Sequence, residues 1–212
     1  MSKLKLYDHV ESQNGYKVRL ALSNLKIEYE WIPVDLAGGE QKKDWFLNLN
    51  PQGKVPTLLD DDFSVWESSA ILLYLGRKFA PNNLIPQDIK KLGMMLEWIM
   101  YEATTLGKNI SGARFLTKFM PPDKVNKEEL NKYRRESTRA LKIADEHLSK
   151  NNFLAIDYSM ADIACYCQIY TTSEGEVDIS KFQAIKSWQK RIESQPGYVD
   201  MRKDVPKHTS CV

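Results

Sequence analysis

The chain has 212 residues, of which 42% are apolar and 27% are charged, a composition typical of globular proteins large enough to bury a core. Its net charge of +2 gives no strong attraction to nucleic acid or to an anionic membrane. No apolar stretch approaches the roughly 20 residues of a membrane-spanning helix, and the N-terminus lacks the apolar core of a secretory signal.

The first 80 residues predict alternating strands and helices. Residues 3–7 alternate apolar and polar side chains like a strand, and 16–25 have apolar residues at helical spacing after Asn14 and Gly15. The next expected elements are a strand at 29–34, a weak helix at 41–49, a hairpin of strands at 55–59 and 63–66, and a helix at 68–79. The strand–helix–strand start implies a parallel pair, to which the hairpin adds antiparallel strands in one mixed sheet.

The second half is expected to be all helical. Residues 80–88 contain two prolines and no periodicity, which predicts a linker. After the linker we expect no strand, and four apolar stripes at helical spacing begin at Ile89, Leu130, Ser159 and Phe182. These four stripes predict a helical domain.

The cysteines indicate a reducing compartment. Their number is odd, and two of them lie two positions apart on an expected helix, so they point to different sides: Cys165, Cys167 and Cys211. We therefore expect reduced thiols in a cytoplasmic protein. The three histidines are scattered, and their spacing predicts no metal site.

Two positions allow both a structural and a functional interpretation. Pro56 stands at the start of a strand, where spacing alone favours a trans bond, although a cis Val55–Pro56 bond would turn the Val55 backbone toward a peptide-like ligand. Glu67 and Ser68 stand where a helix begins. They either cap that helix or hold the ammonium and the carboxylate of an α-amino acid, and the residues leave both open.

Several motifs in fixed order resemble the cytosolic glutathione transferase superfamily. They are the order of elements, "GKVPTL" followed by "ESSAILLYL", the stretch "VDLAGGEQKK", the linker and helical second half, and the capping box of Ser159 and Asp162 with Tyr158 and Ile163 as a hydrophobic staple. The resemblance implies a thioredoxin-like glutathione-binding domain at 1–79, with strands and helices in the order βαβαββα. It also implies a linker at 80–88 and a helical domain at 89–212 that forms the electrophile-binding side.

The resemblance also assigns the glutathione contacts. It implies that Pro56 is cis, that the Val55 backbone pairs with the cysteine of glutathione, and that Glu67 and Ser68 hold its γ-glutamyl end. The glycyl carboxylate would be met by Lys42 and Lys54, and by Gln41, which stands where plant-type members have a histidine.

Glutathione has to react as a thiolate, and the resemblance places the residue that stabilises it between the first strand and the first helix. Ser12-Gln13-Asn14-Gly15 is similar to the Thr-x-Asn-Gly motif of the bacterial nu class and of fungal disulfide reductases of this fold. Ser12, assisted by Asn14, is therefore the expected donor to sulfur, as in a bacterial member of Ser/Thr type, nu-like or phi/theta-like. Tyr7 is the alternative, and the lack of a cysteine before Cys165 argues against the cysteine classes.

The resemblance implies a glutathione transferase that attacks small hydrophobic electrophiles. Tyr101 and Thr105 are the residues expected to face the electrophile. One alternative is a glutathione-dependent disulfide-bond reductase or peroxidase of the same fold, and another is a binding protein without activity. Glutathione is the expected co-substrate, no metal is expected, and the expected partner is a second copy of the chain rather than nucleic acid or membrane.

Overall fold

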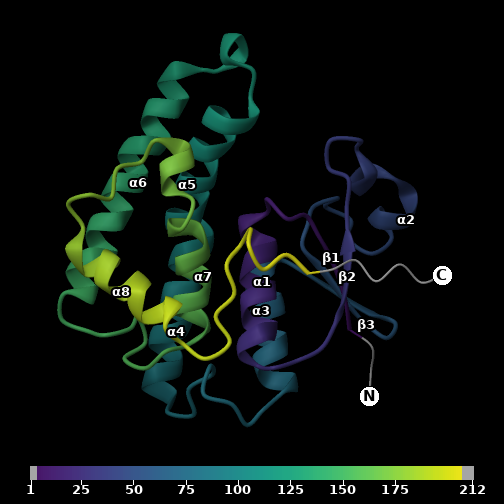
Figure 1. The fold of residues 1–212 in the computed structure, drawn as a ribbon, viewed down its shortest axis with the longest axis horizontal. Coiled ribbons are helices and arrows are strands. Elements are labelled where there is room, and N and C mark those ends of the chain that lie inside the picture. Colours follow the sequence, from purple (N-terminus) through teal and green to yellow (C-terminus); the bar gives the residue numbers. More distant parts are fainter. Residues whose placement is uncertain (1–3, 207–212) are drawn as a thin grey trace. The chain divides into compact units, whose positions relative to one another are not determined.

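The computed structural model describes residues 4–206, which group into two compact units (Figure 1). The first unit holds the chain up to Asn82 and again from Pro196, and the second unit holds Asn83–Gln195. The described end of the chain, residues 196–206, thus belongs to the first unit, whereas the sequence assigned it to a helical domain at 89–212. Its carbonyl groups accept hydrogen bonds from the first helix, which explains this placement.

The first unit has the predicted βαβαββα order of a thioredoxin-like domain. Its elements are β1 (Leu4–Asp8), α1 (Gln13–Asn24), β2 (Glu30–Pro33), a 3-10 turn η1 (Glu40–Lys42), α2 (Asp44–Leu47), β3 (Thr57–Asp60), β4 (Phe63–Trp66) and α3 (Ser68–Lys78). The weak helix predicted at 41–49 is two shorter pieces, η1 and α2, because Lys43 has an extended backbone between them.

The four strands form the mixed sheet that the sequence predicts, in the order β2-β1-β3-β4. β1 pairs in parallel with β2 and antiparallel with β3, and the β3–β4 hairpin is antiparallel. The core of this unit joins the sheet to both long helices through Leu4, Leu6, Val18, Leu22, Trp31, Leu58, Ile71 and Leu75. Each fully buried leucine in this set contributes about 1.5–3 kcal/mol to folding, so the core holds α1 and α3 against the sheet.

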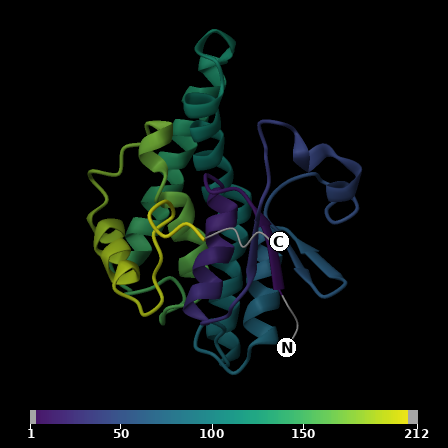
Figure 2. The same cartoon turned by 45° about the vertical axis from the view of Figure 1, so that its right-hand side comes forward.

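The second unit is all helical, as predicted (Figure 2). It consists of α4 (Ile89–Tyr101), a π-helical turn η2 (Glu102–Leu106), α5 (Gly107–Arg114), a second π-helical turn η3 (Phe115–Phe119), a 3-10 turn η4 (Pro122–Lys124), α6 (Lys127–Leu148), α7 (Met160–Ile169), a 3-10 turn η5 (Thr172–Gly175) and α8 (Gln183–Glu193). Four of these helices match the four predicted stripes, and α5 was not predicted. Within residues 4–206, no helix is long and apolar enough to cross a membrane.

The capping box predicted at the start of α7 is present. The Asp162 carboxylate accepts the backbone N–H and the hydroxyl of Ser159, and the Ser159 hydroxyl accepts the Ala161 N–H. Asp162 also accepts the Leu154 N–H at 2.9 Å and the indole N–H of Trp188 at 2.8 Å. One carboxylate therefore joins the start of the fully buried α7 to α8 and to the loop before α7.

Two of the three cysteines lie on α7. Cys165 and Cys167 are buried and free of disulfides, as predicted, and Cys211 lies outside the described residues.

Candidate functional site

The N-terminus of α1 is organised by Ser12. Its Oγ accepts the Gly15 N–H at 3.0 Å, so Ser12 is the N-cap of a helix that begins at Gln13, earlier than the predicted start at residue 16. A hydroxyl that accepts from the backbone keeps its own hydrogen for donation to another group. Ser12 is half-buried and Asn14 is exposed. The site therefore offers one O–H donor at the positive end of a helix dipole.

Asp8 explains why a glycine follows at position 15. The Asp8 carboxylate is fully buried and pairs with the Arg19 guanidinium, Oδ2 to Nε, at 3.0 Å. A Cβ atom on Gly15 would lie 1.5 Å from Asp8 Oδ1, so only glycine lets α1 approach this close. Burial raises the pKa of Asp8 to about 6, although the charge of Arg19 acts in the opposite direction.

Tyr7, the alternative donor, lies in an aromatic cluster. Its ring centre is 6.0 Å from that of Trp45 and 6.3 Å from that of Phe46, which meets it edge-on. Burial, and then the charge of Glu30, raise the pKa of Tyr7. These contacts are those of a half-buried strand aromatic.

The N-terminus of α3 carries Glu67 and Ser68. Glu67 occupies the N-cap position of α3, and no side chain among the described residues makes a capping hydrogen bond there. Glu67 has a φ of +69° in the left-handed region, and its exposed Oε1 accepts the Gln52 Nε2–H at 2.8 Å. Ser68 is buried and its hydroxyl accepts from Lys17 Nζ at 3.2 Å. The uncapped α3 N–H groups and this oriented hydroxyl suit a carboxylate.

Lys17 joins the two helix starts within the first unit. It belongs to α1, only 2% of it is exposed, and it reaches Ser68 on α3. Lys17 follows the Ser12–Gly15 motif in the sequence, but the motif predicted no role for it. Its one available signal is its position in the otherwise apolar stripe of α1, where a lysine has to be paired to be buried.

The Val55–Pro56 bond is cis, as the resemblance implies and against the preference from spacing alone. The loop in front of it is held by Asn50, whose Nδ2 donates to the Lys54 carbonyl at 2.7 Å and to Thr57 Oγ1 at 3.2 Å. Val55 is half-buried and the side chain of Lys54 is exposed. Asn50 is a second supporting residue that no sequence motif identified.

The residues expected at the glycyl carboxylate lie on the turn η1 and after it. Lys42 Nζ donates to the carbonyls of Gln52 and Gly53 at 3.2 and 3.0 Å. Gln41 Nε2 donates to the Leu36 carbonyl at 3.4 Å, and its buried Oε1 has no partner within residues 4–206. Both side chains thus already contact the loops around them.

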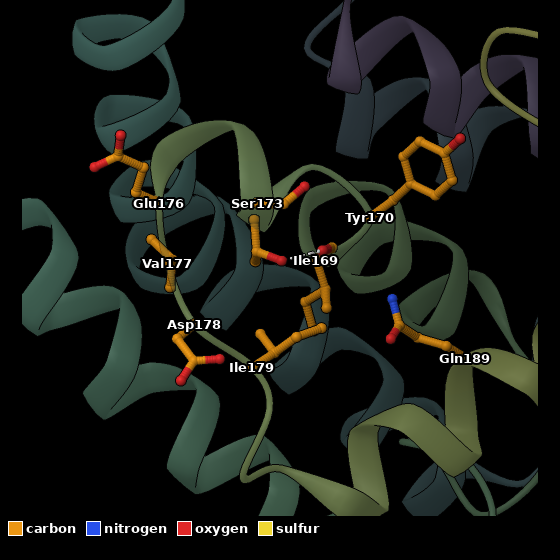
Figure 3. A pocket seen from close by; sticks show the side chains of 9 residues that line it. Ile169, Tyr170, Ser173, Glu176, Val177, Asp178, Ile179 and Gln189 are labelled. Carbon is orange, nitrogen blue, oxygen red and sulfur yellow. Dashed lines mark hydrogen bonds between the residues drawn. The ribbon is translucent and has the colours of Figure 1, made fainter.

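The two residues expected to face the electrophile, Tyr101 and Thr105, both belong to the second unit. The Tyr101 hydroxyl donates to the Ala140 carbonyl at 3.4 Å, and its ring packs edge-on against Trp98 with centres 5.5 Å apart. The Thr105 hydroxyl lies 3.4 Å from that of Thr104. A separate open hollow of about 390 Å³ contains none of the predicted residues and is lined by Ile169, Tyr170, Thr172, Ser173, Glu176, Val177, Asp178, Ile179 and Gln189 (Figure 3).

No group of three or more histidine, cysteine, aspartate or glutamate side chains within residues 4–206 is arranged to hold a metal ion.

Comparisons with known proteins identify the family of this chain. The family model for the glutathione S-transferase N-terminal domain matches residues 2–77, and the model for the C-terminal domain matches residues 92–196. Among solved structures, a possible glutathione S-transferase from Rhodopseudomonas palustris is 32% identical, with a TM-score of 0.89 over 96% of this chain and 91% of that chain.

Two further relatives are similar over most of their length. The disulfide-bond oxidoreductase YfcG of Escherichia coli is 28% identical over 191 residues, which are 86% of this chain and 87% of the relative. A glutathione transferase from Pseudomonas putida, solved with one glutathione disulfide bound per subunit, is 26% identical with a TM-score of 0.85 and covers 92% of this chain and 88% of its own. Because both family models match and together cover most of the sequence, the chain belongs to the glutathione S-transferase family.

Proposed function

We propose that the protein is a glutathione transferase whose first unit binds glutathione and whose Ser12 stabilises the thiolate. The observation that carries this proposal is the Ser12 hydroxyl, which accepts from Gly15 and keeps its hydrogen for donation at the start of α1. The bound thiol loses its proton to solvent. The thiolate then attacks an electrophilic carbon, where a carbon–sulfur bond forms and the leaving group departs with its electron pair.

The peptide would be held at both ends. Glu67 pairs with the γ-glutamyl ammonium, while Ser68 and the uncapped N–H groups of α3 bind the neighbouring carboxylate. The backbone of Val55 pairs with the cysteine residue of glutathione. The glycyl carboxylate is met by Gln41, Lys42 and Lys54. Tyr101 and Thr105, which belong to the second unit, stay predicted contacts of the electrophile.

Replacement of Glu67 by alanine tests the binding site. Loss of a hydrogen bond to a charged group costs about 1.5–3 kcal/mol, so the Kd for glutathione should rise by roughly 10- to 150-fold in a calorimetric titration. Glu176→Ala is a matched control, since Glu176 is also exposed and also has a positive φ, but lies in the second unit beside Arg134. Equal affinity of Glu67→Ala and the unaltered protein would remove Glu67 from the site.

A second candidate activity is glutathione-dependent disulfide reduction. The similarity to the disulfide-bond oxidoreductase YfcG favours it, as does the Ser-x-Asn-Gly motif. Here the bound thiolate attacks a disulfide, a new sulfur–sulfur bond forms, and the other sulfur leaves as a thiolate. Binding to immobilised glutathione, followed by an electrophile assay and a disulfide assay, separates both activities from a third candidate, a binding protein without catalysis.

We further propose that the protein is a homodimer, because two-fold symmetry is the commonest closed assembly and the resemblance to this superfamily implies a dimer. Sedimentation at micromolar concentration should give about twice the chain mass of 24.5 kDa. A single species at the mass of one chain would refute this proposal. A cytoplasmic location is proposed as well, because the buried Cys165 and Cys167 form no disulfide and reduced thiols are typical of that compartment.

A further inference from the structure

The end of the described chain, residues 196–206, forms a strap along α1, and the yellow segment beside α1 in Figure 1 shows its course. Three α1 side chains donate to strap carbonyls at alternate positions, all within the first unit. Asn24 Nδ2 donates to Gly197 at 2.9 Å, the Tyr16 hydroxyl to Val199 at 2.7 Å, and Arg19 to Met201 at 2.9 Å.

Close packing against α1 also holds the strap in place. Met201 is fully buried, and Gly197 has a φ of +83°. A Cβ atom on Gly197 would lie 2.8 Å from the Ser23 carbonyl oxygen, so the strap approaches the last turn of α1 more closely than any other residue type permits. The strap therefore starts at the C-terminal end of α1 and runs back toward its N-terminus.

The far end of the strap is anchored next to Ser12. The Arg202 guanidinium makes two hydrogen bonds of 3.1 Å, one to each carboxylate oxygen of Glu11, the residue before Ser12. Bidentate pairs of this kind fix orientation as well as distance. The Ser12 N–H donates to the His9 carbonyl at 2.8 Å, so residues 9–12 form a tight turn whose outer side the strap holds.

Arg19 joins the strap to the same turn through a second set of hydrogen bonds, at Met201 and Val10. Its guanidinium donates to Asp8 through Nε, to the Val10 carbonyl through one terminal nitrogen at 2.9 Å, and to the Met201 carbonyl through the other. Arg19 is 2% exposed, so these bonds lie away from competing water. Moving the strap would therefore disturb the backbone at Val10 and Glu11, directly before Ser12.

We propose that the strap keeps the Ser12 hydroxyl in place to donate to the bound thiolate, with Arg19 and Arg202 as positioning residues. This inference rests on the proposed function. The matched family models end at residue 196, so they do not include the strap contacts from Gly197 onward. The strap hydrogen bonds described above reach α1 and the turn before Ser12, so the strap should affect the sulfur and leave the binding of the peptide ends unchanged.

The test uses three variants of the full chain: Arg202→Ala, Tyr16→Phe and the double variant. The first removes the ion pair with Glu11 and the second removes the hydrogen bond to Val199, and neither residue belongs to the proposed site. The pKa of bound glutathione is measured from the ultraviolet absorbance of its thiolate. Arg202→Ala should raise this pKa by roughly 0.2–0.7 unit, which corresponds to the range for an exposed ion pair, and the double variant should raise it further. The Kd for S-methylglutathione, which has no ionisable thiol, should stay the same.

Rescue and control variants distinguish positioning from general destabilisation. Exchange of the pair, Glu11→Arg with Arg202→Glu, should restore the pKa, whereas Arg134→Ala, which breaks a surface pair in the second unit, should not change it. Truncation after Pro206 keeps the strap and should leave the pKa unchanged, and truncation after Tyr198 should raise it.

If the thermal midpoint falls in the strap variants while the thiol pKa stays at its original value, the strap is only structural and the inference is wrong. If the unaltered protein fails to bind S-methylglutathione, the proposed function itself is wrong. The experiment therefore distinguishes a failure of the strap inference from a failure of the proposed function.

Discussion

Replacement of Asp162 by alanine is expected to lower the free energy of unfolding by about 3–5 kcal/mol, because each buried donor left without its acceptor costs about 1–3 kcal/mol. Burial raises the pKa of Asp162 to about 6, although the four hydrogen bonds that its carboxylate accepts act in the opposite direction. Its removal leaves the Leu154 N–H and the Trp188 indole N–H buried without an acceptor. In a thermal melt, the midpoint should fall by roughly 6–20 °C.

Two variants control this result. Asp162→Asn keeps an oxygen acceptor and should cost less than alanine. Ser137→Ala removes a buried hydroxyl that has no hydrogen-bond partner within residues 4–206, so it should be neutral or slightly stabilising. If Asp162→Ala melted within about 2 °C of the unaltered protein, the network would not contribute to stability as its geometry indicates.

Replacement of Ser12 by alanine should raise the pKa of bound glutathione and slow the reaction at neutral pH. A hydrogen bond to a charged group contributes about 1.5–3 kcal/mol, which corresponds to roughly 1–2 pKa units and to a rate about 10- to 100-fold lower below the new pKa. Affinity for the peptide should stay nearly intact, since its ends are held elsewhere. The pH dependence of kcat/KM measures the shift.

Three variants decide which group activates the sulfur. Asn14→Ala should shift the pKa less than Ser12→Ala, and the two should be non-additive if both side chains reach the same sulfur. Tyr7→Phe should leave the profile nearly unchanged, in keeping with its contacts to Trp45 and Phe46. A shift with Tyr7→Phe and none with Ser12→Ala would transfer the role to Tyr7. No shift with either would leave activation to the helix N-terminus and backbone amides.

The sequence predicts the main elements because their apolar residues recur at regular intervals. It places the start of α1 too late because Asn14 and Gly15 resemble capping residues, whereas Ser12 is the cap. It does not predict α5, whose two glycines weaken a helical pattern. Gly112 is required there because the Tyr133 ring would lie 2.7 Å from a Cβ atom, a contact between distant positions that periodicity does not reveal.

The candidate site was predictable where short motifs carry it and not where distant residues support it. Ser12, Glu67 and Ser68 stand at helix starts, which local sequence marks. Lys17 reaches Ser68 across 51 positions, and Arg19 reaches Met201 across 182. Such contacts have no local signature, and the strap carbonyls could have accepted from any neighbouring helix. Tertiary packing alone selects these partners.

The backbone of Glu67 has a consequence for how this protein can change by mutation. A φ of +69° costs about 1–3 kcal/mol for a residue with a side chain and almost nothing for glycine. Selection for heat resistance alone would thus favour a glycine in place of Glu67, and selection for a carboxylate at this position would oppose it. With the role in glutathione binding that we propose for Glu67, stability and ligand recognition compete at this position, so a more stable variant has to find its gains at other positions.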